Sequence, residues 1–202
     1  MLRSVWRLGV LLTVLVTVPR VAAATSIIDF ETLSDGDPVT AQFLGLAFAN
    51  ATALTAGFSL NEVEFPPRSG VNVVADIGGP MRIDFAQTII DVFGYFTYTV
   101  PITLEAFNVS NTSLGSISSV FASNIALSGD PGSAPNELLG LAFPGISYVT
   151  ITGDPGGGSF TLDDFTYTPD PTAVPEPGTL CLVLVGAVAV ARAVRDRRGT
   201  KA

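Results

Sequence analysis

The sequence predicts an all-β fold, a single antiparallel β-sandwich of the jelly-roll type, between two terminal segments that lie outside it. Apolar and polar side chains alternate in short runs such as 81–85 and 102–106, and this two-residue period is typical of half-buried strands. Turn-forming Gly, Pro and Asp residues separate the runs, and none of the runs between the terminal segments has a helical period. The chain has 20 glycines and 14 prolines in 202 residues, which is too many turn formers for a helical bundle.

The expected strands follow one another along most of this region. In the run 81–85, Met81, Ile83 and Phe85 would share one face, with Arg82 and Asp84 on the other. The remaining runs are rich in β-branched and aromatic residues, which strands favour. The expected strands are 27–31, 71–75, 81–85, 88–98, 102–106, 114–121, 138–143, 146–152 and 159–167. The expected turns between them are 35–38, 66–67, 78–80, 130–132 and 154–157.

The content of histidine and cysteine excludes several kinds of chemistry. The chain has no histidine and one cysteine, Cys181. A Ser-His-Asp triad, an imidazole acid or base and a His-ligated metal site are therefore excluded. One thiol also cannot form an intramolecular disulfide.

The N-terminal segment, residues 1–24, has the features of a signal peptide. Arg3 and Arg7 give it a positive start, an apolar run follows at 8–18, and Ala22-Ala23-Ala24 offers a small-residue cleavage site. We therefore expect export and cleavage by signal peptidase.

The C-terminal segment divides into three parts after the domain at 25–170. Residues 171–178 form a Pro-rich linker that contains Val174-Pro175-Glu176-Pro177, residues 179–194 are the expected transmembrane helix, and residues 195–202 form a basic tail. The apolar stretch is short for a bilayer but near spanning length if its flanking arginines reach the interface. Because basic residues stay in the cytoplasm, we expect the domain on the outer side of the inner membrane.

This order of parts resembles the PEP-CTERM sorting signal of Gram-negative bacteria. In that family a Val-Pro-Glu-Pro motif, here Val174, Pro175, Glu176 and Pro177, precedes a transmembrane helix and an Arg-rich end. The resemblance implies processing by an exosortase, then a place in the cell envelope or the extracellular matrix. Proteins with this signal are associated with exopolysaccharide and biofilm, so it also implies a structural or adhesive role.

The domain at 25–170 is strongly acidic. Arg68 and Arg82 are its only basic residues, against 16 Asp and Glu, so its formal charge is −14. Such a charge repels a phosphate backbone, and nucleic-acid binding is not expected. Solubility outside the cell is the plain reading of this acidity.

Both ends of this domain resemble those of many PEP-CTERM ectodomains. The stretch Ile28-Asp29-Phe30-Glu31-Thr32-Leu33 resembles their opening strand, and Gly45-Leu46-Ala47-Phe48 resembles the strand that follows it. The run 160–167, with its Asp163-Asp164 pair, resembles their last strand. Such ectodomains are similar to jelly-roll carbohydrate-binding modules, in which a calcium ion often joins the termini. If the first and last strands lie together, Asp29, Glu31, Asp163 and Asp164 could hold a structural Ca²⁺ through carboxylate oxygens. The alternative is that Asp29 and Asp163 merely face outward; no other cofactor is expected.

Three functions remain open for the domain. A sugar-binding face would use an exposed aromatic ring, and the chain offers Tyr95, Tyr98, Tyr148 and Tyr167 outside the signal peptide. An enzyme acting on polysaccharide through paired carboxylates needs no histidine, but an abundance of acidic residues does not by itself indicate one, and we expect no catalysis. A passive matrix component without a ligand is the third.

Overall fold

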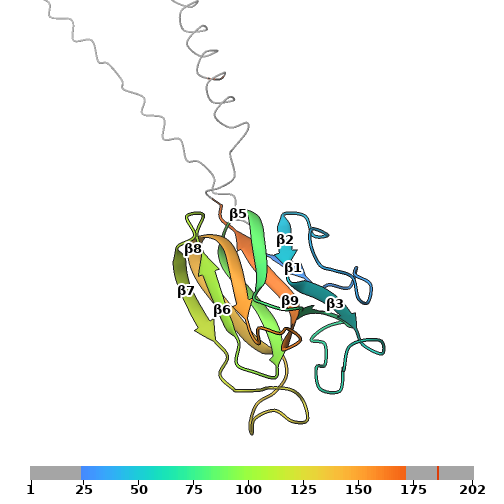
Figure 1. The fold of residues 1–202 in the computed structure, drawn as a ribbon. Coiled ribbons are helices and arrows are strands. Elements are labelled where there is room, and N and C mark those ends of the chain that lie inside the picture. The colour runs from blue at the N-terminus through green and yellow to red at the C-terminus, as the bar shows by residue number, and fades with distance from the viewer. Residues whose placement is uncertain (1–23, 172–185, 187–202) are drawn as a thin grey trace, which may run out of the picture.

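A computed structural model describes residues 24–171 and Gly186, and residues 24–171 form an all-β domain (Figure 1). The all-β, antiparallel prediction is confirmed. The strands are β1 (Ser26–Ile28), β2 (Leu46–Ala49), β3 (Ala51–Thr55), β4 (Asn72–Asp76), β5 (Met81–Tyr98), β6 (Thr103–Phe107), β7 (Ser113–Ser118), β8 (Glu137–Thr152) and β9 (Phe160–Pro169).

Two long strands, β5 and β8, connect the two layers of the sandwich. The first half of β5 pairs with β2 and with the second half of β8, which in turn pairs with β6. The second half of β5 pairs with β9 and with the first half of β8. Register shifts interrupt the β5–β8 ladder between Asp84 and Asp91, and irregularities of this kind let a strand bend from one sheet into another.

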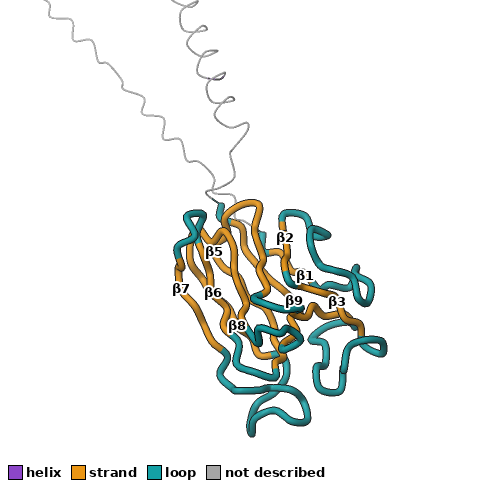
Figure 2. The backbone as a smooth tube through the Cα atoms, viewed as in Figure 1, coloured by secondary structure: helices purple, strands orange, loops and turns teal. Residues whose placement is uncertain are grey.

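The first and last strands lie together, as the sequence suggested. β1 pairs with β9 in the register Ser26↔Tyr167 to Ile28↔Phe165, and β4 pairs with the same strand farther back, at Leu162 and Thr161. The hydrogen-bonded order is β3-β4-β9-β5-β8-β6-β7. Both ends of the described chain therefore leave from one end of the domain, at the top of Figure 2.

The core lies between the two layers and is continuous. Ile83, Val149 and Leu104 fill it from one layer and Phe96, Leu162 and Phe165 from the other, each at most 1% exposed. Aromatic rings join the layers, because Phe165 of β9 packs against Phe48 of β2 and stacks on Phe85 of β5, with ring centroids 6.2 Å apart in both pairs.

The predicted strands differ from the observed ones in four places. The runs 81–85 and 88–98 are one strand, as are 138–143 and 146–152, because the backbone bends without leaving the ladder. The first strand stops at Ile28, and the buried Phe30 adopts a positive φ of 61°. β3 was missed, since Ala-Thr-Ala-Leu-Thr has little strand signal and forms a strand by pairing with β4.

The terminal predictions lie outside the described residues. These are the signal peptide, the linker with its Val174–Pro177 motif, the transmembrane helix and the basic tail. Among the residues that the structure does describe, none belongs to a helix of sufficient length and apolarity to cross a membrane.

Replacement of Phe165 tests the packing between layers. Phe165→Ala should lower the free energy of unfolding by about 3–5 kcal/mol, because the lost ring leaves a cavity among other aromatic side chains. Phe58→Ala is the matched control, since that ring is 81% exposed, and it should change stability little. Chemical denaturation of the purified variants measures both values, and equal losses would contradict this account of the core.

Candidate functional site

The loop at residues 66–72 is held in place by carboxylates from both ends of the domain. Asp163 Oδ2 accepts the backbone N–H groups of Arg68 and Ser69, at 2.7 and 2.9 Å. Asp164 Oδ1 accepts the hydroxyl of Ser69 at 2.7 Å. The loop is thereby fixed to β9, although 94 residues separate Ser69 from Asp163 in the chain.

A β-bulge in β9 directs these two carboxylates toward the loop. Phe93 and Tyr95 of β5 are two residues apart, but they face Thr166 and Asp163, which are three apart. Asp164 is the extra residue and has a positive φ of 45°. Such an insertion reorients neighbouring side chains, and here Asp163 becomes 2% exposed.

Glu31 holds the other end of the loop. Its Oε1 accepts the N–H groups of Val71 and Asn72, at 3.0 and 2.9 Å. The Asn72 side chain donates in return to the carbonyls of Phe30 and Leu33. Gly70, with φ 53°, passes so close to the Glu31 carboxylate that a Cβ there would overlap it, and a larger residue would displace that carboxylate.

Three of the four carboxylates predicted to bind calcium therefore meet on one loop. Glu31, Asp163 and Asp164 all contact residues 68–72, whereas Asp29 is exposed and accepts the N–H of Glu31 at 3.2 Å. Within the described ranges, no three acidic or cysteine side chains are grouped so that they could hold a metal ion. The calcium site stays a prediction of the sequence, and backbone N–H groups are the partners that the structure shows.

Asp163, which binds the loop at 66–72, has a raised pKa. Burial raises its pKa to about 6, from an ordinary value of 3.8, and the neighbouring Asp164 carboxylate adds to the rise. The N–H groups of Ser69, Asp164 and Arg68 oppose it, because hydrogen bonds to the ionised form favour that form.

Arg68 extends from the held loop over an aromatic ring of β5. Its guanidinium carbon lies 4.6 Å from the ring centroid of Tyr95. Leu138 of β8 pairs with Tyr95 and is 54% exposed. Gly140 of β8 pairs with Phe93, and a Cβ at Gly140 would lie 2.6 Å from the Cβ of Phe93. Tyr95, Phe93, Leu138 and Arg68 form what we call the Arg68 face, which lies on the outer side of the layer that contains β9.

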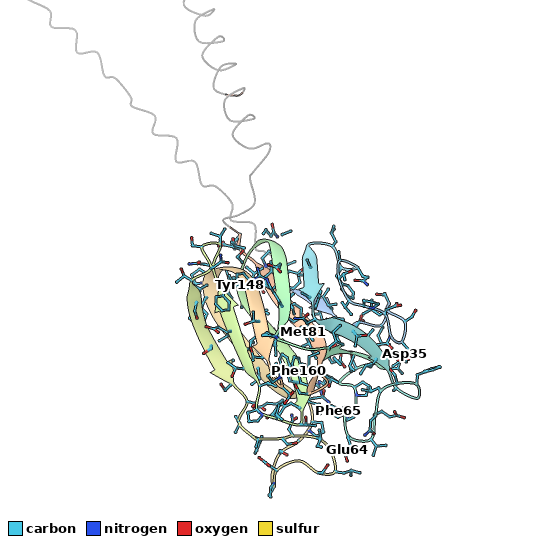
Figure 3. All side chains as sticks on the ribbon, viewed as in Figure 1. Asp35, Glu64, Phe65, Met81, Tyr148 and Phe160 are labelled. Carbon is cyan, nitrogen blue, oxygen red and sulfur yellow. The ribbon has the colours of Figure 1, made fainter. Side chains whose placement is uncertain are left out.

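A second arginine–tyrosine pair occurs on the outer side of the other layer. Arg82 lies 3.6 Å above the ring centroid of Tyr148, whose opposite side stacks on Phe107 at 4.7 Å; Figure 3 labels Tyr148. Here the guanidinium also binds Asp84 through two hydrogen bonds, at 2.8 and 2.6 Å. By contrast, none of the described residues forms an ion pair or a side-chain hydrogen bond with the Arg68 guanidinium.

Two of the other tyrosines considered as sugar contacts are less accessible than Tyr95, which is half-buried. Tyr98 is fully buried and donates its hydroxyl to Glu137, and Tyr148 is 8% exposed. Tyr167 is half-buried beside Phe85 and Phe165. The alternation of Tyr95 and Phe96 indicated that one ring faces outward, but the partnership with Arg68 could not be predicted, because it depends on a loop some 27 residues away.

The pH dependence of stability tests the environment of Asp163. The folded state binds more protons than the unfolded state between pH 3.8 and about 6. The stabilisation from Asp163 is therefore complete below pH 3.8 and is lost as the pH rises through about 6. Relative to Asp163→Asn, the free energy of unfolding of the wild type should fall between pH 4 and pH 7, by about 3 kcal/mol at most. Denaturation at several pH values measures this difference; Asp29→Asn, an exposed control, should follow the wild type.

The predicted calcium site can be measured separately. If the site binds calcium, the unfolding midpoint should rise with added Ca²⁺ and fall again with a chelator, because a ligand that binds only the folded state stabilises that state. Asp163→Asn should abolish the rise. A midpoint indifferent to both additions would contradict the calcium site.

Two solved structures resemble the described domain. A DUF4465 family protein from Bacteroides caccae has a TM-score of 0.45 and 11% identity, and the match covers 73% of this chain and 100% of that one. The K1 cleaved adhesin domain of Lys-gingipain from Porphyromonas gingivalis W83 has a TM-score of 0.43 and 10% identity, with 73% and 99% covered. We infer no function from either likeness, and no curated protein matches the chain.

The C-terminal segment gives a definite match. Residues 173–198, which include Val174–Pro177, match the family described as the PEP-CTERM protein-sorting motif. The resemblance noted in the sequence is confirmed. The motif implies an exported protein that is anchored at its C-terminus before an exosortase processes it, and this chain carries that motif.

Proposed function

We propose that this exported protein has a non-catalytic, structural or adhesive role in the cell envelope or the surrounding matrix, linked to exopolysaccharide or biofilm. The sorting motif at residues 173–198 supports it, because the motif implies export and C-terminal anchoring. Signal peptidase and exosortase would process the chain, and the inner membrane would hold it until then. The β-sandwich would be the part that acts outside.

We also propose that the Arg68 face binds a saccharide. The unpaired state of the Arg68 guanidinium, among the described residues, is the observation that carries this proposal. Its N–H groups can donate to sugar hydroxyls, while Tyr95 and Leu138 offer apolar surface to the sugar ring. With a domain charge of −14, an uncharged saccharide suits this face better than a polyanion.

The geometry gives less support to a polysaccharide-active enzyme. Glycoside hydrolysis needs two carboxyl groups that reach the substrate. Asp163 is 2% exposed, and its oxygens accept three N–H groups. Glu31 accepts two more. Their positions fit a structural role, in which they fix the loop that carries Arg68.

Two matched arginine variants test the saccharide site. Arg68→Ala should weaken retention of the whole chain, in detergent, on gels that contain neutral polysaccharides by roughly tenfold or more, because a hydrogen bond from a charged donor is lost. Arg82→Ala should leave retention unchanged, since Arg82 stacks on a tyrosine in the same way but is already bound to Asp84.

Other outcomes would contradict the proposal. Equal retention of both variants would exclude the Arg68 face, and retention only on uronate-containing gels would exclude a neutral ligand. Release of reducing ends from any polysaccharide, abolished by Asp163→Asn or Glu31→Gln in a folded variant, would favour the enzyme.

A further inference from the structure

One end of the sandwich lies next to the exit of the C-terminal segment. The pair Ile89↔Pro169 closes the β5–β9 ladder, and the N–H of Asp170 donates to Thr88 O at 2.8 Å. The bends of β5 and β8 also lie here, and the N–H of Ala86 donates to Gly45 O at 2.9 Å. The β6–β7 hairpin turns at the same end (Figure 1), since Phe107 pairs with Tyr148 and Tyr148 with Asp84.

The loops at this end carry no charged residue, in a domain that is otherwise acidic. It consists of the segments 40–45, 86–88, 108–112 and 143–145, which we call the exit end. None of the 16 acidic residues and neither arginine of the domain lies in these segments. The neighbouring Asp84 is paired with Arg82 at 2.6 Å. Asp29, Asp91 and Asp170 are carboxylates beside the exit end, and the exposed Asp29 lines a surface hollow together with Phe43 and Leu44.

Two apolar side chains project from the exit end. Leu44 is 99% exposed and Val109 is 80% exposed, and each lies at the tip of a connection. Beside Leu44, Phe43, Leu46 and Phe85 line an apolar hollow of about 380 Å³. A contiguous apolar surface is typical of a site that meets another apolar phase, and here Leu44 with the hollow beside it provides such a surface.

The length of the linker keeps the exit end near the lipid bilayer. Only residues 172–178 separate the last described residue of the domain, Pro171, from the expected membrane segment that begins at Thr179. Seven residues span about 25 Å even when fully extended. While the chain is anchored, the exit end therefore cannot move far from the bilayer surface.

We propose that the exit end docks on the outer surface of the lipid bilayer while the protein is anchored, with Leu44 and Val109 in the interfacial layer. The lipid surface is zwitterionic or uncharged, because a domain of charge −14 is repelled by anionic headgroups. Docking fixes the orientation of the domain, so that the linker stays close to the membrane, where it is processed. The inference depends on the C-terminal anchor and is independent of saccharide binding.

Site-specific fluorescence in the anchored protein tests this proposal. The full chain, with Cys181→Ser, is reconstituted in phosphatidylcholine nanodiscs and labelled with an environment-sensitive dye through Leu44→Cys or Val109→Cys. Leu127→Cys is the matched control, because Leu127 is 74% exposed in the β7–β8 connection at the opposite end (Figure 1). The Leu44 and Val109 probes should emit at shorter wavelength and be quenched by lipid-attached spin labels roughly tenfold more strongly than the Leu127 probe.

Lipid composition provides a second readout. Addition of phosphatidylglycerol to the nanodiscs should reduce quenching at Leu44, and salt should restore it by screening the repulsion. Equal quenching at all three positions would overturn the proposal, as would protection of Leu44 that appears only when two chains share a disc, since the occupant would then be a second copy. Neither result bears on retention by polysaccharide, so this proposal and the saccharide site fail separately.

Discussion

The pairing of β5 with β8 is the constraint on which the rest of the structure depends. Each strand belongs to both layers, so their pairing joins the two sheets, with the register shifts at the point where both strands bend. The bends that allow this lie at the end where β9 leaves the domain. Because both strands bend together, they bring the loops of the exit end to the same end of the sandwich. The exit end is in this sense a consequence of the ladder.

Acidic residues in this domain find their partners mainly in the backbone. With two arginines for 16 acids, salt bridges cannot satisfy the carboxylates. Asp76, at 2% exposed, instead accepts the N–H groups of Ser159 and Phe160, at 2.8 and 2.9 Å. Glu31 and Asp163 likewise accept backbone N–H groups of the loop at 66–72. Such bonds are charge-assisted and stronger than neutral ones, and they hold long loops where no strand pairs them.

The surfaces proposed for function are separated by this architecture. The Arg68 face lies on the side of one layer, and the exit end closes the sandwich where the chain continues toward its anchor. Docking of the exit end would leave the Arg68 face exposed to the surroundings of the cell. The two arginine–tyrosine pairs differ in whether the guanidinium is free to bind a ligand. Arg82 is hydrogen-bonded to Asp84, whereas no described residue offers a side-chain acceptor to Arg68.

The sequence by itself determined the all-β class, the sorting motif and most strands, because these depend on local periodicity and on residues adjacent in the chain. It also indicated that the first and last strands meet. Only the tertiary structure decided that 81–98 and 137–152 are single bent strands, since a bend and a turn have similar local sequences. It likewise decided that Glu31, Asp163 and Asp164 converge on one loop through hydrogen bonds that span 40 to 95 residues. Which backbone groups a carboxylate meets depends on long-range packing, and no spacing along the chain records that.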